Sequence, residues 1–251
     1  MKTAASCALR MAVPAAFVCS SFAFANPGIT SSVVYTDAAN DIASGITTGG
    51  GTLDLLSMEV SHTATDVIFK LTVNGSVSST DWGKFMIGIS TGAGDTATNG
   101  NGWARPINMT SNGGMTRWVG SWVDSGGGAQ LWNYSSSSWS GPGSLAGFSF
   151  AAGAQSTLTY TVSMASLGVS NGSTIYFDAY SSGGGGGDSA VDALSRSDAS
   201  ISNWGGPFTT AGIAAGTSAS TAGGAFAYTI PAPGALALLG AATLVGSRRR
   251  R

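Results

Sequence analysis

STLTYTVSM, from Ser156 to Met164, has the clearest strand pattern in this 251-residue chain. Apolar side chains occupy every second position, and threonine or serine fills the positions between them; the apolar set is Leu158, Tyr160, Val162 and Met164. A period of two places alternate side chains on opposite faces of a β-strand. The stretch therefore predicts a strand with one buried face.

The same alternation recurs in four other runs. They are DVIFKLTVNG from Asp66, KFMIGIS from Lys84, STIYFDAYS from Ser173 and AFAYTI from Ala225. Glycine, serine and asparagine clusters separate the runs, and no window has a convincing helical stripe. Many short strands joined by Gly-rich turns are typical of a sandwich or a barrel. Because nothing fixes the closure of a barrel, we expect an all-β fold, an antiparallel β-sandwich with Gly/Ser-rich loops.

The first 25 residues have the pattern of a targeting segment. Two basic residues come first, an apolar run follows, and Ala23 and Ala25 form an A-x-A cleavage site. This pattern predicts a secretory signal peptide over residues 1–25. Both cysteines, Cys7 and Cys19, lie inside it. We therefore expect the exported chain to contain no disulfide and no cysteine-based metal site.

The chain closes with IPAPGALALLGAATLVGSRRRR, from Ile230 to Arg251. As a helix, its apolar run 234–246 would be roughly 20 Å long, which is short of the roughly 30 Å hydrocarbon core of a bilayer. The basic cluster that follows favours the cytoplasmic side and consists of Arg248, Arg249, Arg250 and Arg251. The segment predicts a hydrophobic helix that holds the protein at the inner membrane, with the body facing outward.

Between these ends lies a body of residues 26–230, which is long enough for one all-β domain. It carries five basic and 12 acidic residues, a net charge of −7. An acidic body without a basic stripe argues against nucleic-acid binding.

Six of the seven tryptophans lie between Asp81 and Trp139. In TRWVGSWVD, Trp118 and Trp122 fall on one strand face with Gly120 between them, which predicts a flat slot for a sugar ring. Core packing is the alternative for each tryptophan. Arginine and other polar side chains near the indoles would bond the hydroxyls of a sugar. The predicted ligand-binding residues are Trp103, Arg105, Trp118, Trp122, Trp132 and Trp139.

Catalytic patterns are weak in this sequence. The only histidine, His62, precedes both G-x-S-x-G matches, whereas that hydrolase order places the histidine after the serine. We therefore expect a protein that is not an enzyme. Two alternatives stay open: a protein–protein adhesion module, and a glycan-active enzyme using a carboxylate pair drawn from Asp124, Asp178, Asp188 and Asp192.

Two clusters offer oxygen ligands of the kind that calcium prefers. They are Asp37, Asn40 and Asp41, and Asp95, Asn99 and Asn101. Their spacing matches no known calcium loop, and turn chemistry explains the same residues. The sequence thus predicts no cofactor, with a structural calcium ion as the alternative.

Several stretches of the body resemble bacterial β-sandwich domains related to family 9 carbohydrate-binding modules and the DOMON-like group. They are LDLLSMEVSHTATDVIFKLTVNG, DWGKFMIGISTG, GNGWARPINM, WVGSWVDSGGGAQLWNYSSSSW and DSAVDALS, spanning about Thr36 to Ser195. The resemblance implies a ligand-binding or structural sandwich of an exported protein, with sugar or haem ligands in that group.

The C-terminal segment, residues 231–251, resembles the PEP-CTERM sorting signal of exported bacterial proteins. Pro231, Ala232 and Pro233 stand where that signal has Pro-Glu-Pro, and the apolar run and arginine cluster follow as in the family. The resemblance implies processing by a sorting protease of the exosortase type. We expect a transiently anchored protein of the cell envelope or extracellular matrix that binds polysaccharide or acts structurally.

Overall fold

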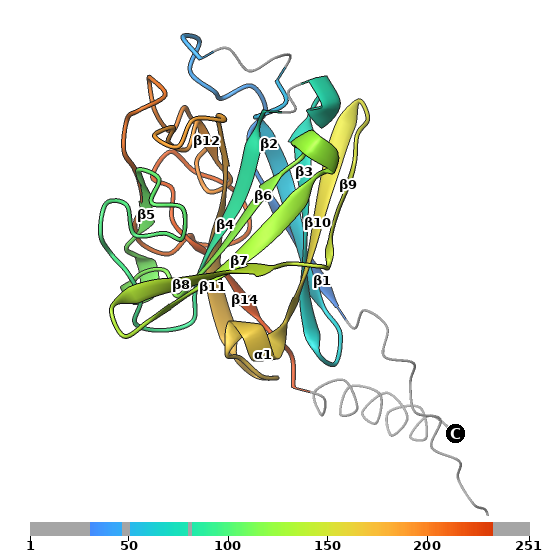
Figure 1. Cartoon of the computed structure of the whole chain (residues 1–251), viewed down its shortest axis with the longest axis vertical. Helices are drawn as coiled ribbons and strands as arrows, with labels where there is room; N and C mark the ends of the chain where they lie inside the picture. Colours follow the sequence, from blue (N-terminus) through green and yellow to red (C-terminus); the bar gives the residue numbers. More distant parts are fainter. Residues whose placement is uncertain (1–30, 47–50, 80–81, 233–251) are drawn as a thin grey trace, which may run out of the picture.

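The structure, a computed structural model, describes residues 31–46, 51–79 and 82–232 (Figure 1). The predicted signal peptide, with Ala23 and Ala25, lies outside the described residues. So do Pro233, the apolar run and the terminal arginines of the predicted sorting segment. Within the described ranges, no helix is long and apolar enough to cross a membrane.

One sheet has five antiparallel strands in the order β1-β2-β3-β10-β9. These strands are β1 (Ser32–Thr36), β2 (Leu55–His62), β3 (Asp66–Asn74), β9 (Phe148–Ala151) and β10 (Gln155–Ser163). The predicted strand STLTYTVSM is confirmed: Leu158, Tyr160 and Val162 are buried on β10, opposite Leu71, Phe69 and Val67 of β3. Met164 instead begins α1 (Met164–Leu167).

The second sheet has the order β12-β11-β4-β6-β7-β8, with β14 also paired to β11. Its strands are β4 (Lys84–Ser90), β6 (Arg117–Trp122), β7 (Gly128–Ser135), β8 (Ser138–Ser144), β11 (Thr174–Ser182), β12 (Asp192–Ala193) and β14 (Phe226–Thr229). A small parallel pair joins β5 (Ile107–Met109) to β13 (Phe208–Thr210). Three short 3-10 helices complete the described elements: η1 (Val77–Ser79), η2 (Ser111–Gly113) and η3 (Asp124–Gly126).

The two large sheets pack face to face around a shared core. Tyr160 of the first sheet bonds Ser121 of the second through their hydroxyls, 2.8 Å apart. The Tyr35 ring lies edge-on to Phe177 with centroids 5.0 Å apart. The all-β prediction is therefore confirmed, and the arrangement is that of a β-sandwich.

Loops cover the central strands of the second sheet on its outer side (Figure 1). Strands β4 and β11 are consequently buried on both faces, and Met86, Asp178 and Tyr180 are fully enclosed. Phe208 of β13 packs edge-on against Tyr180, with ring centroids 6.0 Å apart. Most of the tryptophans between Asp81 and Trp139 lie in this part of the molecule, where loops cover the second sheet.

Candidate functional site

Gly120 leaves a gap on the face of β6, as predicted, but the side chain of Trp103 fills this gap. A Cβ built on Gly120 would lie 2.4 Å from Cζ2 of Trp103, so this indole occupies the space above the glycine. Trp118 is fully buried, stacked on Tyr180 and edge-on to Trp103. The structure therefore differs from the expected sugar slot, because the 91–116 loop folds back over this face and Trp118 is part of the core.

Gln130 of β7 holds two of the predicted tryptophans. Its Oε1 accepts hydrogen bonds from Nε1 of Trp103, at 3.0 Å, and from Nε1 of Trp132, at 3.3 Å. Trp132 also lies against Gly102, where a Cβ would stand 2.3 Å from the ring. Because only the amide oxygen can accept these bonds, the NH2 group of Gln130 is the part left for a ligand.

Arg105 and Trp139 are also engaged within the protein. Arg105 is buried, and its Nη1 donates to Ser182 Oγ at 2.7 Å and to the Asp188 carbonyl at 3.0 Å. Its guanidinium also lies 5.5 Å from the ring centroid of Trp103, and burial lowers the pKa of this arginine. Trp139 Nε1 donates to the Asp95 carboxylate at 2.8 Å. These residues join loops to the sheet.

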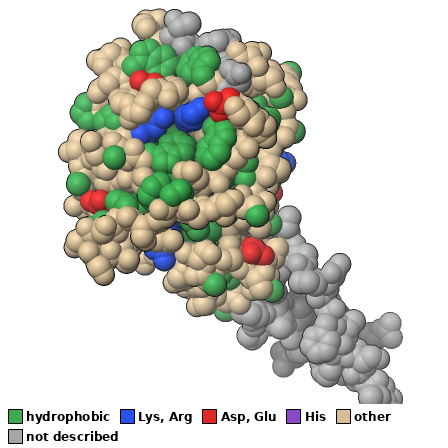
Figure 2. Space-filling model, in the orientation of Figure 1, with side chains coloured by type: hydrophobic (Ala, Val, Ile, Leu, Met, Phe, Trp, Pro, Cys, Tyr) green, Lys and Arg blue, Asp and Glu red, His purple; other side chains and the backbone are tan. Residues whose placement is uncertain are grey.

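Trp122 differs from the other predicted tryptophans because it lines an open groove of about 590 Å³. The groove lies between the edge strands β8 and β9, with η3 at one end. Its aromatic side chains are Trp122, Phe148 and Phe150. Figure 2 shows hydrophobic side chains gathered around a hollow in the upper part of the face in view, with basic and acidic side chains beside them.

The glycine run 126–128 makes this groove. A Cβ on Gly127 would stand 2.5 Å from the Phe150 ring, and one on Gly128 would stand 2.4 Å from the Trp122 ring. The two rings therefore lie directly against bare backbone. Gln130, Ser144 and Ser149 supply polar groups along the groove, and none of its lining residues is charged.

A second aromatic pair lies elsewhere on the surface. Trp82 is 38% exposed and lies edge-on to Trp204, with centroids 5.9 Å apart. Together with Gly184 and Asp188 they line a shallow pocket of about 400 Å³. Sequence reasoning did not associate these two tryptophans, because about half the chain separates them.

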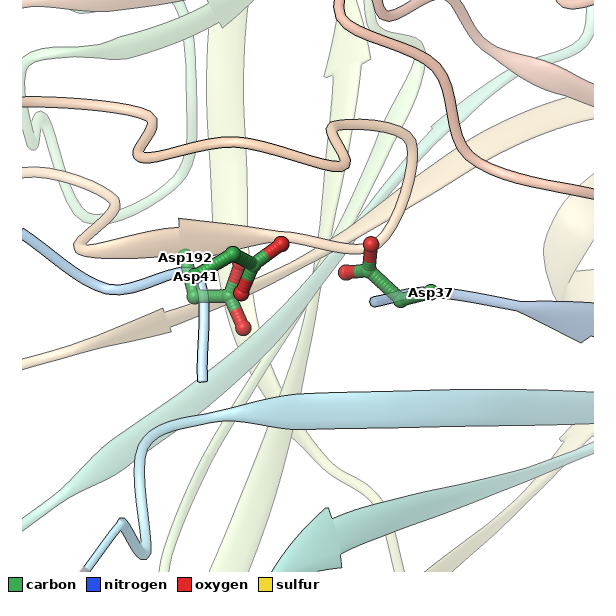
Figure 3. A group of neighbouring side chains, drawn as sticks. All are labelled: Asp37, Asp41 and Asp192. Carbon is green, nitrogen blue, oxygen red and sulfur yellow. The ribbon is translucent and has the colours of Figure 1, made fainter. Parts of the chain in front are cut away.

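The two predicted oxygen-rich clusters have different structures. Asp95 and Asn101 hold turns: Asp95 Oδ1 accepts from the Ala97 amide, and the Asn101 side chain bonds the backbone of Arg105 and Ile107. Asp37 and Asp41 instead meet Asp192 of β12, with one ligand atom of each residue within 4.8 Å of the others (Figure 3). Asn40 contributes its backbone amide rather than its side chain. These carboxylates are the described residues that could hold a metal.

The four candidate catalytic aspartates do not converge on the groove. Asp178 and Asp192 are fully buried under the outer loops, and Asp124 pairs with Lys84 at 3.4 Å. Asp188 accepts a hydrogen bond from the Gly185 amide in its own loop. None of the four lines the groove of Trp122.

Comparison with known proteins adds no identity to this geometry. A scan of the chain against protein-family models and a search of curated proteins both returned no match.

Proposed function

We propose that this protein is an exported, non-enzymatic β-sandwich that binds extracellular polysaccharide in the groove of Trp122. One observation carries the proposal: two aromatic rings that line the groove lie directly against bare glycine backbone, Trp122 at Gly128 and Phe150 at Gly127. Sugars have apolar C–H faces and a rim of hydroxyls, and amphipathic aromatic rings suit the former. The groove volume is within the range of about 300–1,000 Å³ that is usual for ligand pockets.

Polar groups in the groove suit the hydroxyl rim of a sugar. The Trp103 and Trp132 indoles fix the Gln130 side chain through its Oε1, so its NH2 group can donate to a hydroxyl. Ser144 and Ser149 add hydroxyls that donate or accept. Because no charged residue lines the groove, it favours a neutral polysaccharide over an acidic one.

The sorting part of the proposal rests on how the fold ends. Strand β14 ends at Thr229, and Ile230 is the last buried residue of the described ranges, its amide donating to the Ser173 carbonyl at 2.9 Å. The motif of Pro231, Ala232 and Pro233 therefore begins where the sandwich stops. A protease of the exosortase type could then release the protein from the inner membrane to the envelope or matrix without cutting into the core.

Affinity gel electrophoresis tests the binding proposal. The purified protein should be retarded by a soluble neutral glucan or galactomannan more than by acidic alginate. Trp122→Ala should weaken that retardation at least tenfold because it removes the stacking ring. Trp82→Ala is the matched control, since it truncates an exposed tryptophan outside the groove and should bind like the wild type.

Three other outcomes would contradict the proposal. Loss of binding in Trp82→Ala alone would move the site to the Trp82–Trp204 pocket. No retardation by any glycan, together with self-association, would favour the adhesion module. Cleavage of the glycan, lost on single Asp→Asn changes, would favour the enzyme.

Sorting is tested separately with an epitope tag after Arg251 expressed in the native host. The released protein should lack the tag, because processing removes the C-terminal segment. A released protein that retains the tag would contradict the sorting proposal.

A further inference from the structure

Four aspartates, two of them buried and two half-buried, lie at one edge of the sandwich, away from the groove. Asp37 and Asp41 lie in the segment after β1, Asp54 precedes β2, and Asp192 is on β12. In Figure 3, Asp37 and Asp41 approach Asp192 from the chain segment that follows β1. Their carboxylates come from three parts of the sequence.

Backbone hydrogen bonds hold these segments together. Asp54 Oδ2 accepts from the amide of Asn40 at 2.9 Å, one residue before Asp41. Asp192 Oδ2 accepts from the amide of Leu55 at 2.6 Å, one residue after Asp54. These hydrogen bonds fix the three segments to one another, so the fold itself places the four carboxylates close together.

The carboxylates are buried yet incompletely partnered. Asp54 is 2% exposed and Asp192 is 1% exposed. Four buried oxygens have no hydrogen-bond partner: Asp37 Oδ2, both carboxylate oxygens of Asp41, and Asp54 Oδ1. Asp54 Oδ2 accepts hydrogen bonds from the Asn40 amide and from the Asn74 side chain. Oδ1 of Asp54, whose carboxylate neighbours Asp41, is therefore the oxygen left without a partner.

These four carboxyl groups lie together without a basic partner. The ion pairs among the described residues are Lys84 with Asp124 and Arg196 with Asp198, and neither includes these four aspartates. Burial first, and then the charge of Asp54, raises the pKa of Asp41 to about 6. Burial and the neighbouring carboxylates also raise the pKa of Asp37 and of Asp192. Burying unpaired charge is costly unless a counter-ion neutralises it.

We propose that Asp37, Asp41, Asp54 and Asp192 bind one calcium ion. All their donors are carboxylate oxygens, the ligands of a hard cation, and histidine and cysteine donors for zinc are missing from the group. Calcium takes six to eight oxygens in flexible geometry, whereas magnesium demands a strict octahedron and gives up its waters reluctantly. The four free oxygens, with further lone pairs on Asp192, supply most of a calcium shell.

The ion would join three segments that are far apart in sequence. It would fix the segment after β1 to the start of β2 and to β12 at the edge of the second sheet. The inference is independent of polysaccharide binding, because the groove of Trp122 shares no residue with this group. Its role is to stabilise the sandwich.

Thermal unfolding of the purified protein tests the proposal. With free calcium about 100-fold above its Kd, the Tm should be about 5–10 °C higher than in EDTA. Elemental analysis after dialysis against micromolar calcium should find one calcium per chain. Magnesium at the same concentration should give a smaller shift.

Substitutions separate a cation site from a group of protonated carboxyls. Asp41→Asn should weaken calcium binding at least tenfold and should raise the Tm in EDTA, because it removes a repelling charge. Asp124→Asn, an Asp→Asn change outside the group, should keep the full calcium shift. An equal Tm for the wild type in calcium and EDTA, with no bound calcium, would overturn the proposal, and so would a larger shift with zinc.

Discussion

Adding one methyl group at Gly120 should destabilise this protein strongly. The Cβ of Gly120→Ala would stand 2.4 Å from Cζ2 of Trp103, whereas carbon atoms pack at about 3.5–4.0 Å. The indole must therefore move by about 1 Å. Overpacking of this kind costs about 1–3 kcal/mol, and the displaced indole also loses its bond to Gln130, worth about 1 kcal/mol. We expect a loss of about 2–4 kcal/mol in the free energy of unfolding.

Urea unfolding followed by far-UV circular dichroism measures this loss. Gly92→Ala is the control, because its Cβ would meet no atom within 4 Å, and it should change stability by less than about 0.5 kcal/mol. In a Trp103→Ala background the cost of Gly120→Ala should fall by at least about 1 kcal/mol, since the obstructing ring is gone. Wild-type stability of the single variant would refute the packing of Trp103 over Gly120 and would reopen the predicted sugar slot on β6.

Three further perturbations test separate contacts. Gln130→Glu keeps the acceptor for both indoles but replaces the NH2 group, so glycan retardation should weaken while the Tm stays close to the wild type. Ser121→Ala leaves the buried Tyr160 hydroxyl without this hydrogen-bond partner. The free energy of urea unfolding should fall by about 1–3 kcal/mol, and adding Tyr160→Phe should recover part of that loss. Burial raises the pKa of Asp178 to about 7. The unfolded state therefore releases this proton first, so stability should fall as pH rises from about 4 to 7. Asp178→Asn should flatten this fall when the unfolding free energies of the two proteins are compared in excess calcium.

Local alternation was enough to predict the strands that face the core. The pattern in Ser156–Met164 is a property of adjacent residues, so β10 could be read directly from the sequence. The burial of β4 and β11 on both faces could not, because the covering loops come from residues 91–116 and 183–210. Their contacts with the sheet, such as that of Phe208 with Tyr180, depend on tertiary structure.

The same limit applies to the sites. The alternation of side chains along a strand correctly placed Trp118 and Trp122 on one face of β6. Only the tertiary structure shows that Trp118 is buried whereas Trp122 lines the groove. Phe148 and Phe150 were missed because they reach the groove from the other sheet. In the acidic group, the turn-rich segment of Asp37 and Asp41 was visible in the sequence. Asp54 and Asp192 carried no local signal, since each is an isolated aspartate beside a short apolar run.

Binding of neutral polysaccharide in the groove of Trp122 can be followed at the indole of that residue. Two-dimensional 15N–1H NMR of the tryptophan indoles, titrated with a soluble neutral oligosaccharide that the protein binds, tests it most directly. Binding in this groove should give a saturable shift of the Trp122 indole resonance, assigned with Trp122→Phe, while the resonance of the buried Trp118 does not move. A shift confined to Trp82 and Trp204, or no shift at saturating sugar, would contradict it.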